Sequence, residues 1–173
     1  MLNYGKGIGM GSFRGCVVPL GTGLALILSA TPSLAATVVT VDLWDKGANV
    51  DMPKGVVYGA PGLDISKATM GMRLSRPSAP AGEVTFNVIN SSKDMIHEMI
   101  VMYRQDPTTL LPFIDNENRV DEDKAGDKGE VSELNPGQSG SLTVTLAPGK
   151  YVLVCNVPGH YGAGMWAEFD VTK

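Results

Sequence analysis

Apolar and polar residues alternate, with a period of two, along several short segments of this 173-residue chain. Between residues 82 and 90, for example, Val84, Phe86 and Val88 alternate with mostly polar neighbours. This period is typical of β-strands with one buried face, and turns rich in glycine and proline separate the segments. We therefore predict an all-β chain folded as an antiparallel sandwich or barrel, with strands at residues 37–43, 70–74, 82–90, 95–103, 140–146, 150–155 and 165–171.

Two stretches of the chain lack this alternation. Residues 47–75 have no steady period, and we expect loops there around one or two short strands. Residues 104–133 hold nine of the 18 acidic residues and only four basic ones. A connection of this length is long for a compact domain, and such connections are usually functional or partly helical. We expect a long, acidic and solvated insert within a single domain.

The first 35 residues have the composition of a secretory signal peptide. They carry two basic residues and no acidic residue, and they include an uncharged, largely apolar run at residues 17–30. Ser33 and Ala35 supply small residues at the −3 and −1 positions of a cleavage site. We expect residues 1–35 to be a signal peptide cleaved near Ala35, so that residues 36–173 form an exported, periplasmic domain without a membrane span. An uncleaved anchor is the alternative, but a proline and two glycines interrupt the apolar run.

Cleavage changes both the cysteine inventory and the charge of the chain. Cys16 is removed, so that Cys155 becomes the only cysteine and no internal disulfide can form. A lone thiol in an oxidising compartment is a liability unless it is occupied. The formal net charge of −4 becomes more negative, because two basic residues leave with the signal. This acidity argues against nucleic acid as a partner and suits solubility or a basic protein partner.

One short motif, CNVPGHYGAGM at residues 155–165, holds a cysteine, a histidine and a methionine. His160 lies in this motif, and the only other histidine, His97, lies in an apolar strand upstream. One thiolate, two imidazoles and a weak axial thioether are the ligands of a blue-copper electron-transfer site. Methionine is a poor zinc ligand, and iron–sulfur clusters need more cysteines. The sequence therefore favours a copper site formed by His97, Cys155, His160 and Met165.

With these residues, the chain resembles the cupredoxins, the small blue-copper proteins that fold as a Greek-key β-sandwich. The resemblance covers roughly residues 37–173 and is strongest toward the C-terminus. Four residues separate the cysteine of the motif from its histidine, and four more separate that histidine from the methionine. This spacing is similar to that of rusticyanin-like members of the family rather than to that of azurin. The stretch NSSKDMIHEMIV resembles the strand that carries the family's upstream histidine.

The resemblance implies one type 1 copper ion, with His97, Cys155 and His160 as equatorial ligands and Met165 as the axial ligand. It further implies that both imidazoles bind copper through Nδ1. Many members of the family have asparagine or serine after the upstream histidine, where they help to hold the ligand loop. This chain has Glu98 at that position.

The function that the resemblance implies is transfer of single electrons by an exported monomer that is not an enzyme. Its partners would be redox proteins such as a c-type cytochrome or a terminal oxidase. Copper enzymes need a second copper site, for which two histidines are too few. A cysteine nucleophile with His160 as its base lacks an acidic group to orient the base, and it leaves Met165 unexplained.

A copper-handling protein, used in trafficking, storage or resistance, is the alternative function. Residues 36–173 contain seven methionines, and thioethers bind Cu(I). Met70, Met72, Met95 and Met99 are the candidates for additional Cu(I) ligands. Packing in the core is the simpler role for these side chains.

The route by which electrons reach copper is a further expectation. His160 lies on a loop, so we expect it to be the ligand nearer the surface, whereas His97 is buried in a strand. Tyr161 and Ala163 follow His160 closely in the sequence. We expect them to form a small apolar surface of the kind that serves weak, transient docking of redox partners.

Overall fold

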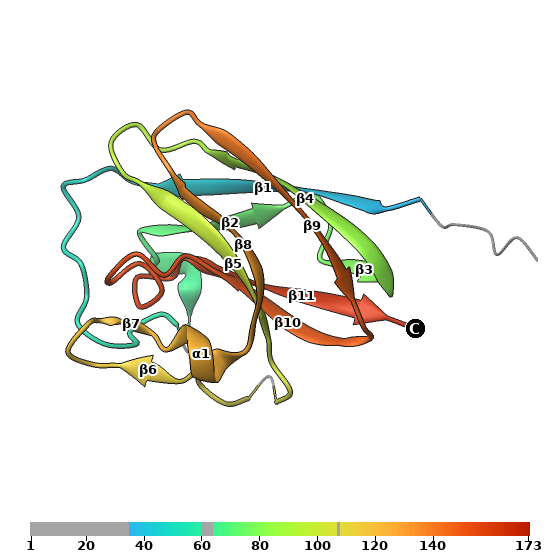
Figure 1. The fold of residues 1–173 in the computed structure, drawn as a ribbon. Helices are drawn as coiled ribbons and strands as arrows, with labels where there is room; N and C mark the ends of the chain where they lie inside the picture. The colour runs from blue at the N-terminus through green and yellow to red at the C-terminus, as the bar shows by residue number, and fades with distance from the viewer. Residues whose placement is uncertain (1–34, 60–63, 107) are drawn as a thin grey trace, which may run out of the picture. The chain divides into compact units, whose positions relative to one another are not determined.

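Two β-sheets make up most of the chain that the computed structural model describes, which is residues 35–59, 64–106 and 108–173 (Figure 1). The predicted signal peptide, residues 1–35, lies outside this part except for its last residue. No helix within the described residues has both the length and the apolar character needed to cross a membrane.

The first sheet has four strands in the order β2, β1, β4 and β9. Their bounds are β1 (Thr37–Asp45), β2 (Met70–Leu74), β4 (Gly82–Asn90) and β9 (Ser139–Leu146). β1 pairs in parallel with β4, whereas the other neighbours in this sheet are antiparallel. All four strands were predicted, with shifts of one or two residues at some ends: alternation indicated β1, β4 and β9, and β2 was the short strand expected within residues 47–75.

The second sheet has five strands in the order β3, β11, β10, β5 and β8. Their bounds are β3 (Ser78–Pro80), β5 (His97–Tyr103), β8 (Asp127–Leu134), β10 (Gly149–Val154) and β11 (Trp166–Thr172). β3 runs parallel to β11, and the remaining pairs are antiparallel. The sequence predicted β5, β10 and β11 but neither of the two edge strands.

The order of the strands is that of a Greek-key sandwich. The chain passes from one sheet to the other between β2 and β3, β3 and β4, β4 and β5, β8 and β9, and β9 and β10. Strands that are distant in sequence therefore become neighbours, as when β4 pairs with β9 and β5 pairs with β10. Such crossing connections are the mark of Greek-key sandwiches. The predicted fold class, an all-β Greek-key β-sandwich, is confirmed.

The main hydrophobic core lies between the two sheets. Every second residue of β1 is buried there, namely Val39, Val41 and Leu43. From opposite sheets, Phe86 and Phe169 meet edge to face with ring centroids 5.2 Å apart. Burial of one face of each sheet is the physical reason for the period of two in the sequence.

A second cluster covers the outer face of the second sheet. Ile100 and Met102 of β5, with Val152 and Val154 of β10, belong to this cluster rather than to the main core. They pack against Leu111, Val120 and Ala125. These two strands are thus buried on both faces, which explains why their sequences are continuously apolar instead of alternating.

The segment at residues 104–133 has more regular structure than the solvated insert that we expected. It contains the hairpin of β6 (Phe113–Ile114) and β7 (Arg119–Val120), the short helix α1 (Glu122–Ala125) and most of β8. Most of this segment is exposed or half-buried, as expected, but its few apolar residues pack on the second sheet, so it is not a free loop. One further turn of 3-10 helix, η1 (Ile65–Lys67), precedes β2.

Candidate metal centre

His97 is the first residue of β5, directly after the turn that leaves β4. The buried side chain of Asn90, the last residue of β4, holds this turn in place. Its Nδ2 donates to the backbone carbonyls of Met95 and Leu134, each at 2.8 Å, and its Oδ1 accepts from the amide of Ser92. The position of the His97 backbone is therefore fixed by both sheets.

The loop from Cys155 to Met165 joins β10 to β11 and closes on itself through backbone hydrogen bonds. The amide of Cys155 donates to the carbonyl of Met165, and the amide of Met165 donates to the carbonyl of His160, both at 3.0 Å. Gly159 and Gly164 have φ angles of 87° and 104°, which side-chain-bearing residues rarely adopt. The glycines of the motif thus allow the tight reversal that brings its cysteine, histidine and methionine together.

Three donor atoms from this loop and from β5 converge on one point. Nδ1 of His97 lies 3.2 Å from Nδ1 of His160, and Sγ of Cys155 lies 3.9 Å and 3.4 Å from these two nitrogens. The centre of such a triangle is about 2 Å from each corner, close to the bond lengths of about 2.0–2.3 Å for imidazole and thiolate on a first-row metal. The donor set and its size fit one such metal ion.

All three of these residues are buried, with 0%, 0% and 4% of His97, Cys155 and His160 exposed. Within the described residues, they form the one group of three or more histidine, cysteine or carboxylate side chains whose ligand atoms all lie within 4.8 Å of one another. The pairing of Cys155 and His160 with a histidine 58 residues upstream of the cysteine was predicted from the inventory of the sequence, and the fold brings them together.

Met165 is also buried and lies beside the same three residues. Its amide and carbonyl bond to His160 and Cys155, as described above, and its side chain belongs to the main core cluster together with Cys155. This location is compatible with the predicted axial position. The assignment of all four residues as copper ligands stays a prediction.

Asp45, the last residue of β1, contacts the ring of His97 on the side opposite the donor triangle. Oδ2 of Asp45 lies 2.7 Å from Nε2 of His97, and 2% of the Asp45 side chain is exposed. Burial would raise the pKa of this carboxyl, but hydrogen bonds from Ser92, His97 and the amide of Gly47 hold it below its ordinary value. The carboxylate is an acceptor only, so Nε2 of His97 carries the hydrogen and Nδ1 presents a lone pair.

The sulfur of Cys155 accepts a hydrogen bond from the backbone amide of Glu98, at 3.4 Å. Complete burial raises the pKa of the thiol to about 12, although amide hydrogen bonds from Glu98 and Val157 act in the opposite direction. Without a metal ion the side chain is thus a thiol at neutral pH.

The two imidazoles are shifted toward their neutral forms. Burial, together with the neighbouring His97, lowers the pKa of His160 to about 4. Burial also lowers the pKa of His97, although Asp45 opposes this effect. Because metal ions bind neutral imidazole, both rings are ready to act as ligands at neutral pH.

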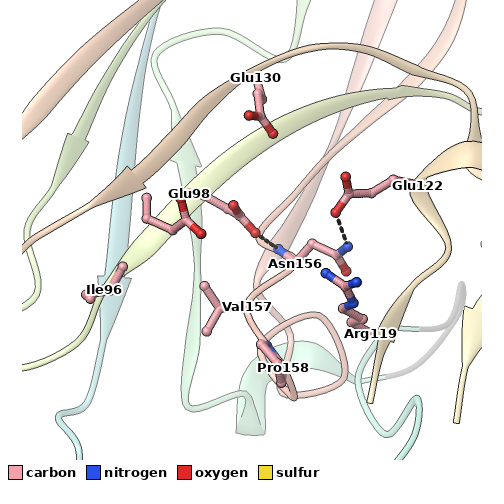
Figure 2. Close-up of a pocket in the computed structure, with 9 residues that line it drawn as sticks. Ile96, Glu98, Arg119, Glu122, Glu130, Asn156, Val157 and Pro158 are labelled. Carbon is pink, nitrogen blue, oxygen red and sulfur yellow. Dashed lines mark hydrogen bonds between the residues drawn. The ribbon is translucent and has the colours of Figure 1, made fainter. Parts of the chain in front are cut away.

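Glu98 supports the loop of residues 155–165. Its Oε1 accepts from the amide of Asn156, the residue after Cys155, at 2.9 Å, and Figure 2 shows this bond at the wall of a pocket. The side chain of Asn156 bonds to both backbone groups of Val120 and to Glu122. The segment around β7 and α1 therefore anchors the loop through Asn156. Burial also raises the pKa of Glu98 to about 7.

Residues 52–59, which we call the cover segment, lie over the loop on another side. The amide of Tyr58 donates to the carbonyl of Gly162 at 2.7 Å, and the hydroxyl of Tyr161 donates to the carbonyl of Gly59. Asn118, in the turn between β6 and β7, bonds to the cover segment through its side chain and to Gly159 through its carbonyl.

The cover segment corrects one prediction. Tyr161 and Ala163 are each 1% exposed, so they do not form the apolar docking surface that the sequence led us to expect. His160 is not markedly nearer the surface than His97 either. The prediction failed because residues 47–75 show no period, so that nothing in the sequence indicated where that segment packs.

Asp45 is the residue at this site that the sequence analysis missed, and a signal for it existed. In β1 the odd-numbered residues face the core, and Asp45 continues the series after Leu43. A carboxylate at a core-facing position is costly unless it has a partner. Its presence there therefore indicates a buried hydrogen-bonding group such as the imidazole of His97.

Comparison with known proteins gives one family and several similar proteins. A model described as the sulfocyanin (SoxE) domain matches residues 71–173 of the chain. Auracyanin-B from Chloroflexus aurantiacus is 55% identical over 40 residues, which cover 22% of this chain and 17% of that protein. The match thus spans less than a fifth of the length of this relative.

Two solved structures align with this chain at low sequence identity. Reduced auracyanin from Roseiflexus castenholzii aligns at 18% identity over 82% of this chain and 100% of its own, with a TM-score of 0.48. Rusticyanin from Thiobacillus ferrooxidans aligns at 18% identity over 80% of this chain and 79% of its own, with a TM-score of 0.49.

Proposed function

The chain belongs to the sulfocyanin (SoxE) domain family of the cupredoxins, and on this premise we propose that it is an exported carrier of single electrons. Its cofactor is one type 1 copper ion. His97, Cys155 and His160 would hold this ion as equatorial ligands, and Met165 would be the axial ligand. When bound, copper supplies a centre that alternates between Cu(II) and Cu(I) by gain and loss of one electron.

The observation that carries this proposal is the convergence of three buried donor atoms from two distant parts of the chain. The nitrogens and the sulfur lie 3.2–3.9 Å apart, the ring of His97 bonds to Asp45, and the sulfur of Cys155 accepts from the amide of Glu98. A rigid frame of this kind changes little when the charge of the bound ion changes by one. Small rearrangement of the ligands is what fast electron exchange requires.

The burial of the site favours a carrier over an enzyme. At most 4% of any of the three donor residues is exposed, so a substrate molecule has no direct access to a bound ion. An electron needs no such access, because it can pass through the surrounding residues. We therefore propose redox proteins, such as a c-type cytochrome or a terminal oxidase, as donor and acceptor, and a monomer as the working form.

Export of the chain is part of the same proposal. Residues 1–35 would direct secretion and be removed near Ala35, which leaves residues 36–173 as the copper-binding domain. An acidic, exported protein with one cysteine then has its only thiol occupied by copper rather than exposed to oxidation.

Titration of the purified residues 36–173 with Cu(II) tests the proposed function. We expect an intense blue absorption that saturates at about one copper per chain, with reversible bleaching by a one-electron reductant. Cys155→Ser is expected to abolish the colour, because the thiolate supplies it. A wild-type chain that stays colourless in the presence of Cu(II) would contradict the proposal.

No specific observation favours the alternative of a copper-handling protein. Met70, Met72 and Met99 are buried in the main core, and Met95 packs against it. These contacts are those of methionines that fill space in a hydrophobic interior. Colourless Cu(I) bound in addition to the single blue copper, in the same titration, would support the alternative instead.

A further inference from the structure

The carboxylate of Asp45 is the only carboxylate within the described residues that the structure pairs with a histidine, and it lies on the far side of that ring from the donor triangle. It stands at the end of β1, which pairs in parallel with β4. Neither strand contributes a donor atom to the triangle. Asp45 also lies outside residues 71–173, the part of the chain that the family model matches.

Asp45 is itself held in one orientation. Its Oδ1 accepts from the amide of Gly47 at 2.6 Å, whereas its Oδ2 faces Nε2 of His97 at 2.7 Å. Each oxygen thus has its own donor. A carboxylate fixed in this way can fix in turn the ring to which it is bonded.

We propose that Asp45 is a positioning residue for copper, which holds His97 in the tautomer with a free Nδ1 and places one negative charge behind this ligand. The inference deepens the proposed function and rests on it. Hydrogen bonds from metal-bound histidines to carboxylates orient the ring and make it a stronger electron donor. The charge favours Cu(II) over Cu(I), because the more positive ion gains more from a nearby anion.

The expected size of the effect follows from other sites of this kind. Loss of a partner of a ligand histidine typically weakens metal binding about 10–100-fold. A tenfold weaker hold on Cu(II) relative to Cu(I) raises the reduction potential by about 59 mV, since one electron is transferred. Asp45 therefore lowers the potential of the site.

The test is the substitution Asp45→Asn, compared with Asp42→Asn as a matched control. Asparagine has nearly the same shape and can still accept from Nε2 of His97, but it carries no charge. Asp42 lies on the same strand, and its carboxylate bonds to Arg73 at the surface. Both variants lose one unit of negative charge, but only Asp45→Asn loses it next to His97.

For the copper-loaded proteins we expect Asp45→Asn to remain blue and its reduction potential to rise by at least the 59 mV of a tenfold change. We expect Asp42→Asn to keep the wild-type potential within a small fraction of that shift, because solvent screens its charge. Equal potentials in wild type and Asp45→Asn, or equal shifts in both variants, would overturn the proposal.

A second measurement does not require copper. Nitrogen NMR of the metal-free wild-type protein, with labelled histidine, is expected to show the proton of His97 on Nε2. A proton on Nδ1 would overturn the proposal even if the variants failed to fold. If the wild type binds no Cu(II), the proposed function itself fails; if it is blue but the potential or the tautomer disagrees, only the role of Asp45 fails.

Discussion

Cys155 carries its proton in the metal-free protein, because complete burial raises the pKa of the thiol to about 12. The pKa values of the two imidazoles are lowered instead of raised. The pKa of His160 is lowered to about 4, also by burial, and that of His97 is lowered as well. At neutral pH the ligand set thus consists of one protonated thiol and two neutral rings, and only the thiol has a proton to lose when a metal binds.

Binding of Cu(II) at pH 7 is therefore expected to release about one proton per copper, and the affinity should rise about tenfold per pH unit between the pKa values of His160 and Cys155. Below pH 4 the dependence should steepen, because His160 must then lose a proton too. Calorimetry in buffers of different ionisation enthalpy measures the number of protons released per copper ion bound. Release of no proton would mean a thiolate in the free protein, and release of two or more would mean charged imidazoles; either result contradicts this account of the site.

Single residues differed in how far the sequence predicted them. The candidate ligands stood out because a chain with two histidines and one remaining cysteine offers few ways to build a site. Asp45 was missed although its core-facing position marked it. Tyr161 and Ala163 were predicted to be exposed and are buried, since burial by a distant segment leaves no trace in the residues around them.

Among the elements, the ligand loop and the cover segment fit together through a glycine. A side chain on Gly162 would overlap the carbonyl oxygen of Gly55, a backbone atom that cannot rotate away. The amide of Tyr58 bonds to Gly162 at the same place. The close approach of two backbones is thus the reason for glycine at this position of the motif.

We expect Gly162→Ala to lower the free energy of unfolding by about 1–3 kcal/mol, the usual cost of forcing an extra group into a packed interior. Gly149→Ala is the matched control, because the one close atom that a Cβ there would meet belongs to the partly exposed ring of Tyr103, at 2.9 Å, which can turn aside, whereas Tyr151 lies at an ordinary contact distance of 3.7 Å. Urea unfolding of the metal-free variants provides the comparison. Equal losses of unfolding free energy in both variants would show that the cover segment does not pack tightly against the loop.

The strands with regular alternation were predicted. Apart from the two-residue strands of the β6–β7 hairpin, the strands that were missed lie at the edges of the second sheet. β3 has three residues and ends at Pro80. β8 is longer, but only Val131 and Leu134 are buried, and its pairing with β5 is interrupted by shifts in register. Such irregularity and charge protect edge strands from unwanted pairing, and they remove the period from the sequence.

For the whole molecule, the main result is that the loop of residues 155–165 is enclosed from two directions. The cover segment closes one side, and the segment with β7 and α1 anchors another through Asn156. The period of two and the resemblance predicted a single β-sandwich, and composition predicted an excess of acidic residues. They did not predict this enclosure, because both enclosing segments lack periodicity and are held by scattered contacts, mostly between a side chain and a distant backbone group.

The central claim is that His97, Cys155 and His160 bind one copper ion together. X-ray absorption at the copper edge of the Cu(II)-loaded residues 36–173 tests it most directly. The account predicts a first shell of two nitrogens and one sulfur at about 2.0–2.3 Å, with the sulfur lost in Cys155→Ser. A first shell of nitrogen and oxygen alone in the wild type, unchanged by Cys155→Ser, would contradict it.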